Sequence, residues 1–577
     1  MSDARTIRQA VQARLARRHR AERRFQLYGL GAIALAVVFL SLLVGSILVQ
    51  SIPAFTAHRL TLQVELDPAL VDPRGDASEA SLRRGSYNTA IQAALREQFP
   101  SVEGRSELRE LFGLYSAVNA ARLLNIVVEN PELVGSSYAF TFPISDDADL
   151  YLKGRTVEER RQLGEGTLTV VPQGEAVELE AGAPAFEPFA ATVRAEARAR
   201  AEAAEARARN AEAAALDTID PDQREVFEAE AERARALAER LRQRLQAGQP
   251  LTLGPQVPSL LVEARGGVFR IEEISADFTR ARAEAVIAPD GAGPAQEWTA
   301  WVLETPAAAR LITDRQVIWT RALSDRGLVE NQFNTMLFTN ADSREPELSG
   351  VLGALIGSVL TMVITMVLAV PIGVGAAIYL EEFAPKNRFT QMIEVNINNL
   401  AAVPSIVYGL LGLAVFINAF GLPRSAPLVG GMVLALMTLP TVIISSRAAL
   451  KAVPPSIREA ALGVGASKTQ AVFQHVLPLA MPGILTGSII GLAQALGETA
   501  PLLMIGMVAF IADPPTLGFA GFSEPATVMP VQIFIWSSSA ERAFEARTAA
   551  AIIVLLGLMV IFNAVAIYLR RRFERRW

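Results

Sequence analysis

Cysteine is absent from this sequence of 577 residues, and histidine occurs only three times. Without cysteine the chain has no disulfide bond, no thiolate metal site and no cysteine nucleophile. The three histidines, His19, His58 and His475, are too far apart in the sequence to suggest a metal cluster. We therefore predict no catalytic residue and no metal site in this chain.

Charged residues are missing, or nearly so, from six long stretches. The chain is 51% hydrophobic, and a helix needs roughly 20 mostly apolar residues to cross a membrane. Six candidate spans reach this length: Leu27–Val49, Val351–Leu380, Leu400–Phe420, Leu428–Ser446, Pro482–Ile511 and Ala549–Leu569. The second is longer than a straight span requires and contains Pro371, so we expect a kink there or an extension beyond the bilayer. The pattern predicts an all-α polytopic membrane protein with six transmembrane helices.

Arginine sets the orientation of these spans, because basic residues are retained on the cytoplasmic side of a membrane. Eight arginines precede the first span, at positions 5, 8, 14, 17, 18, 20, 23 and 24. Six crossings return the chain to the same side, where the tail 570–577 is again basic. We therefore expect both termini in the cytoplasm. A cleaved signal peptide is the alternative for the first span, but its apolar run is about twice the usual core of 7–15 residues, which favours an uncleaved anchor.

These features divide the chain into five parts. Residues 1–24 are expected to form a basic cytoplasmic N-terminus, and residues 25–50 the first transmembrane helix. Residues 51–347 then form an extracytoplasmic domain inserted between helices 1 and 2. Residues 348–569 form the transmembrane core with a charged loop at about 447–478, and residues 570–577 form a cytoplasmic tail.

The inserted domain is expected to be α+β. Two strand hairpins are indicated, one around Pro172-Gln173-Gly174 and one around Arg265-Gly266-Gly267. Between them, residues about 190–247 are rich in Ala, Glu and Arg, and Asp220-Pro221 supplies the start of a second helix. We predict an antiparallel helical hairpin here, which is either a solvated element without a ligand or a coiled-coil arm that contacts a partner.

The charged loop between the fourth and fifth spans carries the most informative motif. Glu459-Ala460-Ala461 is followed by Gly465 and then by Leu477-Pro478. This spacing resembles the coupling loop of importer-type ABC permeases, where a cytoplasmic ATPase contacts the membrane channel; an ordinary amphipathic loop is the alternative. The two alanines let a short helix approach its partner closely, and Gly465 permits a tight turn between two short helices. Pro478 is expected to end the segment. One departure from the family is His475, where an aliphatic residue is usual.

A second motif in this loop only superficially resembles a nucleotide-binding loop. Gly463-Val464-Gly465-Ala466-Ser467-Lys468-Thr469 has a serine before the lysine where a P-loop requires glycine, and no buried strand leads into it. We therefore expect no cofactor on this chain, and ATP with magnesium on a partner ATPase.

From about Asp342 to its end, the chain resembles the PstA family of phosphate permeases. The strings that carry this resemblance are Asp342–Leu348, Ile378–Asn387, Asn398–Gly409 with its Pro404-Ser405-Ile406-Val407-Tyr408-Gly409, and Gly497-Glu498-Thr499-Ala500-Pro501-Leu502-Leu503. The resemblance implies a type I ABC importer permease that moves inorganic phosphate through a bacterial inner membrane. It also implies three partners: a homologous permease (PstC), a dimer of an ATPase (PstB) and a periplasmic phosphate-binding protein (PstS). No nucleic acid is expected among the partners.

Glu498 is the only formal charge between Pro482 and Asp513, so we expect it inside the membrane, where a charge is costly. Pro501 should kink the helix beside it. Many relatives carry an arginine four residues before this glutamate, where this chain has Gln494. The resemblance makes Glu498, Thr499, Gln494 and Ser405 the candidate residues of the translocation pathway. In one interpretation the carboxylate accepts a hydrogen bond from the P–OH of phosphate; in the other it is purely structural.

These patterns together predict a permease subunit that works by alternating access, driven by ATP on a partner, and that is not itself an enzyme. Two alternatives remain open. One is a permease for another oxyanion, such as molybdate or sulfate. The other is a membrane-anchored sensor or scaffold that acts through its periplasmic domain.

Overall fold

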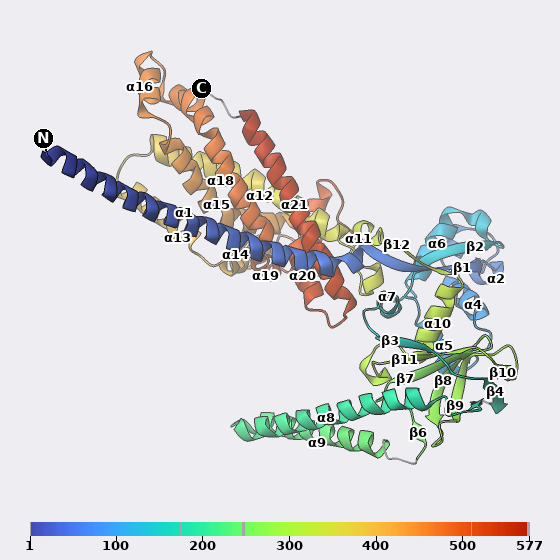
Figure 1. Cartoon of the computed structure of the whole chain (residues 1–577). Coiled ribbons are helices and arrows are strands. Elements are labelled where there is room, and N and C mark those ends of the chain that lie inside the picture. Colours follow the sequence, from blue (N-terminus) through green and yellow to red (C-terminus); the bar gives the residue numbers. More distant parts are fainter. Residues whose placement is uncertain (1, 174–175, 245–248, 509, 574–577) are drawn as a thin grey trace. The chain divides into compact units, whose positions relative to one another are not determined.

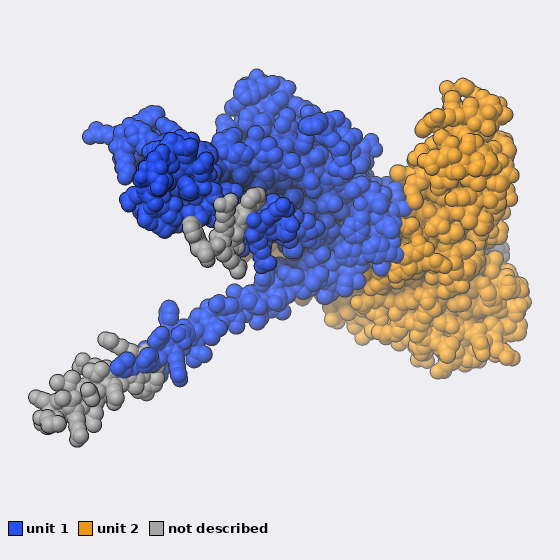
Figure 2. Space-filling model, turned by 90° about the horizontal axis from the view of Figure 1, so that it is seen from above, with its two compact units in different colours: residues 1–56, 333–577 blue, residues 57–332 orange. Residues whose placement is uncertain are grey.

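The computed structural model describes residues 2–173, 176–244, 249–508 and 510–573. The chain forms two compact units, residues 1–56 with 333–577 and residues 57–332 (Figure 2). The second unit lies within the segment 51–347 that the sequence assigns to the inserted domain, and it is shorter at both ends. Three expectations fall outside the described residues: the turn residue Gly174, the end of the helical hairpin near Ala247 and the tail residues 574–577.

The first unit is helical (Figure 1). Its long helices are α1 (Ser2–Ser51), α12 (Leu352–Ile378), α13 (Arg388–Ala401), α15 (Pro427–Lys451), α18 (Leu477–Gly497) and α21 (Ala543–Phe573). Its shorter helices are α11 (Met336–Thr339), α14 (Ser405–Leu411), α16 (Pro455–Gly463), α17 (Lys468–Gln470), α19 (Ala500–Met504) and α20 (Met529–Ser537). The π-helical turns η5 (Tyr379–Phe383), η6 (Gly412–Ala419) and η7 (Ala471–Val476) continue α12, α14 and α17. Three short 3₁₀ helices complete the described part of this unit: η1 (Ile52–Phe55), η4 (Pro346–Leu348) and η8 (Ala520–Phe522).

Among the described residues, five helices are long and apolar enough to cross a membrane, and a bent helix pair makes six if it counts as one span. The five are Ala21–Phe55, Leu352–Phe383, Pro427–Lys451, Lys468–Gly497 and Ala543–Arg572. The second contains Pro371 and runs for 32 residues through α12 and η5. At 1.5 Å per residue this is about 48 Å. This length exceeds a hydrocarbon core of about 30 Å, so part of the helix would extend beyond the bilayer, as expected from the sequence.

The third predicted span, Leu400–Phe420, does not begin where the sequence suggests. α13 ends at Ala401, and the helical segment Ser405–Ala419 leaves it at an angle of 104°. Pro404 lies in the break between them. Because proline has no N–H and disfavours a helical conformation at the residue before it, α13 cannot continue through this position. The expected span is therefore one arm of a broken helix.

The fifth predicted span, Pro482–Ile511, is wrong at both ends. The apolar helix starts at Lys468, runs through η7 and α18, and stops at Gly497. Glu498, with φ −78° and ψ 125°, is already outside the helix, and α19 begins next with Pro501 in its first turn. Pro501 does not kink a helix beside Glu498 but lies in the first turn of a new helix. Proline is tolerated there because residues of the first turn donate no hydrogen bond within the helix, so its missing N–H is not needed.

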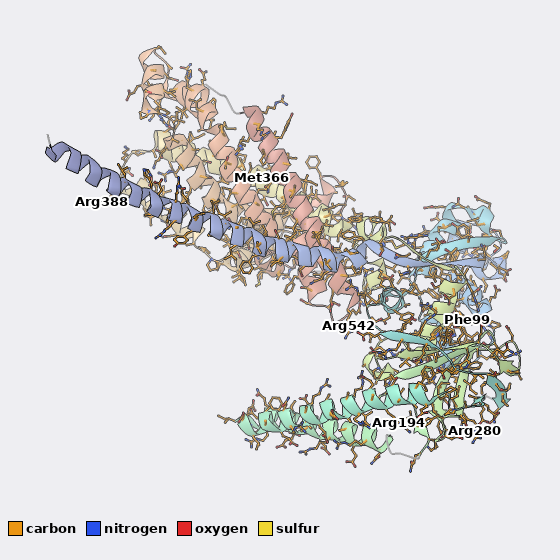
Figure 3. All side chains as sticks on the ribbon, in the orientation of Figure 1. Phe99, Arg194, Arg280, Met366, Arg388 and Arg542 are labelled. Atoms are coloured by element: carbon orange, nitrogen blue, oxygen red, sulfur yellow. The ribbon has the colours of Figure 1, made fainter. Side chains whose placement is uncertain are left out.

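Small residues let the spans of the first unit pack closely. A Cβ added at Gly373 of α12 would lie 2.8 Å from Val442 of α15, and one at Gly487 of α18 would lie 2.0 Å from Ser445 Oγ. Buried side chains of α12, α15 and α18 form a shared core, against which Met366 packs (Figure 3). Such close backbone approach is how helices associate in a membrane, where apolar burial alone gives no driving force.

The second unit contains two sheets. The first has the strand order β12-β1-β2, with β1 (Thr56–Glu65), β2 (Ser137–Pro143) and β12 (Val329–Phe333). In it, β1 and β2 are antiparallel, with Leu62 opposite Phe140. The second has the order β10-β4-β5-β9-β8-β7-β11-β3, with β6 paired to β8. Its strands are β3 (Glu159–Leu163), β4 (Leu168–Gln173), β5 (Ala176–Ala181), β6 (Leu251–Thr252), β7 (Ser259–Ala264), β8 (Gly267–Ile274), β9 (Arg280–Ile287), β10 (Gly293–Ala295) and β11 (Trp298–Leu303).

Helices cover these sheets and close two separate hydrophobic cores. Trp319 and Phe140 are fully buried in one core, and Trp298, Phe186 and Phe269 in the other. The short helices are α2 (Pro68–Val71), α3 (Glu79–Leu82), α4 (Tyr87–Glu97), α5 (Arg105–Phe112), α6 (Asn119–Glu129), η2 (Pro131–Leu133), α7 (Asp146–Leu152), η3 (Ala307–Ala309) and α10 (Asp314–Asp325).

Both predicted strand hairpins are confirmed. β4 pairs with β5, and β7 pairs with β8, each pair antiparallel. The loop of the second is the dipeptide Arg265-Gly266, with φ values of 51° and 70°. Positive φ at both loop residues is typical of the tightest hairpin turns, because their twist matches that of the strands.

Two long helices, α8 (Glu187–Asp217) and α9 (Pro221–Arg244), occupy the stretch rich in alanine, glutamate and arginine. They lie side by side and are joined by a three-residue turn (Figure 1). Asp220 Oδ1 accepts the Asp222 N–H at 3.0 Å and so caps the second helix. At the base of α8, the Arg194 guanidinium lies 5.1 Å from the ring centre of Phe278 (Figure 3). The buried residues of α8 beyond this base are all alanine.

Candidate functional site

The Glu459-Ala460-Ala461 motif lies on α16, a short helix with two different faces. Ala461 is only 7% exposed and is buried within the first unit, whereas Glu459 and Ala460 are exposed. Leu462, one residue further on, is 49% exposed, and Val464 in the following turn is 87% exposed. Apolar side chains beside a carboxylate therefore form an outward surface on which a partner can pack.

The turn expected at Gly465 is present. Gly465 has φ 90°, and its N–H donates to the Leu462 carbonyl at 3.0 Å. A side chain strongly disfavours this backbone conformation, so the position requires glycine. The next helix begins at once with a capping box, in which Ser467 and Gln470 each bond the backbone of the other. The turn between α16 and α17 is thus fixed by local chemistry on both sides.

Leu477-Pro478 does not end the segment that follows Gly465, which corrects the structural role expected for Pro478. The helix runs without interruption from Lys468 to Gly497. The π-helical turn η7 (Ala471–Val476) lies directly before Leu477. A π-turn widens the helix by one residue, which accommodates a proline that has no N–H to donate. The segment that begins at Lys468 and α18 are therefore one continuous helix.

An ion pair that the sequence did not single out connects α16 to η5. Arg458 donates to the Glu382 carboxylate in η5, with Nη2 to Oε1 at 2.6 Å and Nε to Oε1 at 3.0 Å. The same guanidinium donates to the carbonyl of Leu450 in the last turn of α15, at 2.8 Å, and to that of Val453 just after the helix, at 2.7 Å. The Glu382 side chain is only 8% exposed and that of Arg458 is 24% exposed.

Neighbouring residues of η5 also contact basic side chains of other helices. The Glu381 carboxylate lies 3.5 Å from both Arg447 and Lys451 of α15. Arg447 in turn donates to Glu394 of α13 at 2.7 Å. On the other side, the Lys468 ammonium of α17 lies 5.3 Å from the ring centre of Phe383. Opposite charges at the ends of neighbouring spans were the available signal, but the partners lie far apart in the sequence and only the fold pairs them.

The two broken helices meet at a glycine. A Cβ added at Gly409 of α14 would lie 2.7 Å from both the Cα and the carbonyl oxygen of Pro501 in α19. Ser405 begins α14, and Glu498 and Thr499 directly precede α19. The structure therefore brings together two of the four strings that resemble phosphate permeases, Asn398–Gly409 and Gly497–Leu503, each at a break in a helix.

The four candidate pathway residues are not equally accessible. Glu498, Thr499 and Ser405 are half-buried, whereas Gln494 is exposed. Among the described residues, no ion pair or hydrogen bond involves the Glu498 carboxylate. The helix stops at Gly497, so Gln494 lies on α18 and Glu498 lies just beyond its end. A half-buried carboxylate without a partner remains free to accept a hydrogen bond.

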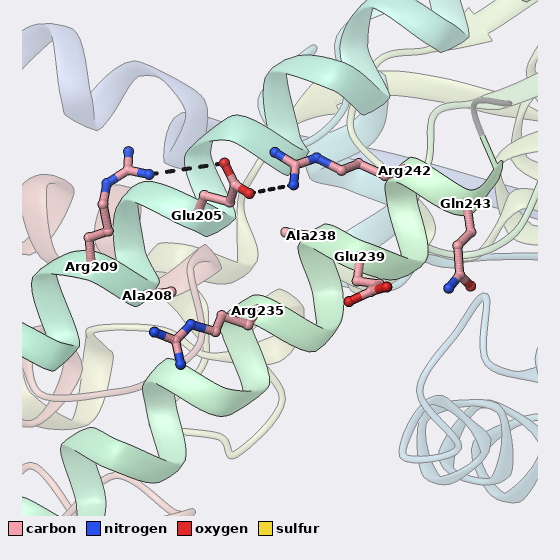
Figure 4. A pocket seen from close by; sticks show the side chains of 8 residues that line it. All are labelled: Glu205, Ala208, Arg209, Arg235, Ala238, Glu239, Arg242 and Gln243. Carbon is pink, nitrogen blue, oxygen red and sulfur yellow. Dashed lines mark ion pairs between the residues drawn. The ribbon is translucent and has the colours of Figure 1, made fainter.

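The second unit has a groove of about 500 Å³ between α8 and α9, remote in sequence from these motifs (Figure 4). Three arginines line it, but they already have acidic neighbours. Arg242 pairs with Glu205 at 2.5 Å, Arg209 lies 4.0 Å from the same carboxylate, and Arg235 pairs with Glu212. The groove therefore offers little uncompensated positive charge to an anion.

Comparison with known proteins bears on the first unit above all. Residues 369–577 match the family described as "Binding-protein-dependent transport system inner membrane component", and residues 12–162 match a "Domain of unknown function (DUF3333)". The "Phosphate transport system permease protein PstA" of Mycobacterium leprae is 30% identical over 44% of this chain and 77% of its own length. The protein of the same description from Haemophilus influenzae is 32% identical over 35% of this chain and 69% of its own length.

The chain belongs to the PstA family of ABC transporter permeases. As a family member it has the type I ABC importer permease fold and is a multi-pass protein of the bacterial inner membrane. Members are permease subunits and are not themselves enzymes. A solved chain from "Inward facing conformations of the MetNI methionine ABC transporter" aligns over 39% of this chain and 96% of its own length, at 18% identity and a TM-score of 0.32.

Proposed function

We propose that this chain is the permease subunit of an ATP-driven importer of inorganic phosphate. The observation that carries the proposal is the meeting of α14 and α19, because it joins two of the strings that resemble phosphate permeases at adjacent helix breaks. In transporters, irregular backbone at membrane depth is tolerated only where protein buries it or where it lines a cavity. Two such breaks in contact are consistent with a translocation pathway between them.

The proposed pathway residues are Ser405, Thr499, Gln494 and Glu498. At neutral pH phosphate retains a P–OH group, which donates a hydrogen bond that the Glu498 carboxylate can accept. Sulfate has no such proton. The side chain of Glu498 is half-buried and without a partner among the described residues, which leaves its oxygens available for this bond. A purely structural role for this acid is the competing interpretation.

The proposed coupling surface comprises Glu459, Ala460 and Ala461 on α16, together with Gly465 and the segment up to Leu477-Pro478. An ATPase dimer of the PstB type would contact it, and ATP with magnesium would bind there and not on this chain. A PstC-like permease would complete the channel, and a PstS-like periplasmic protein would deliver phosphate. Alternating access would then follow from movement of the ATPase against α16.

The proposed topology has six crossings with both termini in the cytoplasm, so that the second unit is periplasmic. In this topology, the hairpin of α8 and α9 is a periplasmic arm, and a coiled-coil contact with a partner is its proposed role. Reporter fusions at residues 200 and 530 should report the periplasm, and fusions at 386 and 465 the cytoplasm. A cytoplasmic signal at residue 200 would overturn the topology.

The function is tested by phosphate flux and ATP turnover in vesicles that contain this chain, its partner permease, the ATPase and the binding protein. We expect Glu498→Gln to lower flux partially if hydrogen bonding dominates, because the amide keeps one acceptor oxygen. A near-complete loss would instead show that the charge is required. Asp513→Asn is the matched control, because it removes the same charge from an exposed position. Wild-type flux in both Glu498→Gln and Glu498→Ala would exclude this acid from the mechanism.

Two other functions are distinguished by the same preparation. Inhibition of radiolabelled phosphate uptake by molybdate or sulfate at equal concentration would favour a permease for another oxyanion. For a membrane-anchored sensor or scaffold, removal of the α8–α9 hairpin would abolish function while Glu459→Lys would have no effect. We expect the reverse order of severity for the importer.

A further inference from the structure

The contacts that attach α16 and α17 to the rest of the first unit involve one turn of the chain, η5. Three consecutive residues of η5 face three different partners: Glu381 faces α15, Glu382 faces Arg458 of α16, and Phe383 faces Lys468 of α17. η5 itself continues α12 without a break. The segments before and after Gly465 are therefore both attached to the end of α12.

Arg458 does more than form one ion pair. Its guanidinium uses all three nitrogens, toward the Glu382 carboxylate, toward one carbonyl in the last turn of α15 and toward one just after that helix. Arginine is suited to this because its donors are fixed in a plane, so that one side chain sets both distance and direction. Its sequence neighbours Glu459 and Ala460 are exposed, whereas Arg458 is mostly buried. The outward face of α16 and its attachment to the spans thus belong to different residues.

We propose that Arg458 and Glu382 are positioning residues that couple α16 to α12 and α15, so that a displacement of α16 by the ATPase moves both spans together. This inference rests on the proposed function of the chain. Neither residue belongs to the outward surface on which the ATPase would dock. Loss of the pair should therefore uncouple transport from ATP hydrolysis and leave the ATPase bound.

The test compares Glu382→Gln, Arg458→Gln and Arg458→Lys in vesicles that contain the complete transporter. We expect both glutamine variants to keep the bound ATPase and its ATP turnover, and to transport at least tenfold less phosphate per ATP. Arg458→Lys should recover part of this ratio, because it restores the charge without the planar donors. Because the two residues act as one pair, Glu382→Gln/Arg458→Gln should be no worse than either single variant. Lys451→Gln is the matched control, since this side chain is 60% exposed and should contribute little.

A wild-type ratio of phosphate to ATP in both glutamine variants would overturn the inference. So would a loss of flux in proportion to a loss of bound ATPase, since Arg458 would then act in docking. Failure of the wild-type transporter to move phosphate would refute the proposed function instead, and the two failures are therefore distinguishable.

A second readout does not depend on flux. The chain has no cysteine, so spin labels can be attached to cysteines introduced at Ser456 of α16 and Tyr379 of η5, both of which are exposed. We expect one label-to-label distance with and without ATP in an otherwise native chain, and a broader distribution that ATP shifts in Glu382→Gln. An ATP-dependent change of distance in the native background as large as in Glu382→Gln would show that the pair does not hold α16 to η5.

Discussion

Replacement of Gly465 by alanine tests whether the turn after α16 matters for coupling. The backbone of Gly465 has φ 90°, a region that an L-residue occupies at a cost of about 1–2 kcal/mol. An added Cβ at Gly465 would meet no atom within 4 Å. The substitution therefore perturbs the backbone conformation and nothing else, which makes its effect unusually simple to interpret.

The size of the effect follows from this backbone cost. About 1–2 kcal/mol lowers the ratio of the native turn to other conformations by roughly 5- to 30-fold. Gly465→Pro should lower uptake more strongly, because proline fixes φ near −65° and has no N–H. The hydrogen bond from the Gly465 N–H to the Leu462 carbonyl, at 3.0 Å, would therefore be lost. Phosphate uptake should thus fall in Gly465→Ala and be lost in Gly465→Pro, while the subunit still inserts in the membrane.

Gly463, two residues earlier, supplies a matched control. It is the last residue of α16, it lacks the positive φ of Gly465, and an added Cβ would again meet no atom within 4 Å. Alanine there favours the helix by up to about 1 kcal/mol, so uptake should be unchanged. The assay is phosphate uptake together with the amount of ATPase that co-purifies. Equal uptake by Gly463→Ala and Gly465→Ala would refute the argument that the left-handed turn is required for coupling.

The remaining predictions concern the contact between α14 and α19 and the membrane topology. Gly409→Ala should lower phosphate flux without loss of bound ATPase, because the added Cβ would lie 2.7 Å from Pro501 and overpacking of this kind costs about 1–3 kcal/mol. Gly557→Ala is the control, because its added Cβ would meet no atom within 4 Å. Equal flux in the two variants would contradict the prediction. The fusions described above should divide between the two sides of the membrane, and agreement at residue 465 but not at 530 would place the error in the segment after α18.

Local chemistry made part of the fold predictable from the sequence. The β7–β8 hairpin could be inferred because Gly266 supplies the backbone freedom that its turn needs. The helix start at Pro221 could be inferred because Asp220 caps it. In both cases the signal and the structure lie within a few residues of each other, so no knowledge of tertiary contacts was required.

The error in the fifth predicted span arose because hydropathy does not distinguish one long apolar helix from two helices separated by a break. The residues after Glu498 are as apolar as a membrane span, so the sequence suggested one long helix where the structure has a break and a new helix with Pro501 in its first turn. Arg458 and Glu382 were missed for a different reason. They are 76 residues apart, and the charges of two loops indicate no pairing until α12 and α15 lie side by side.

Asn334 joins the entry and the exit of the second unit. Asn334 donates its backbone N–H to the carbonyl of Phe55 at 2.8 Å and its side-chain amide to that of Ala54 at 3.0 Å. The helical unit therefore holds both ends of the inserted chain at a fixed, short separation. Loop-closure entropy grows only slowly with the length of such an insertion. The permease can thus carry a domain of several hundred residues, or a short loop, at this site without a change in the length or register of its own helices.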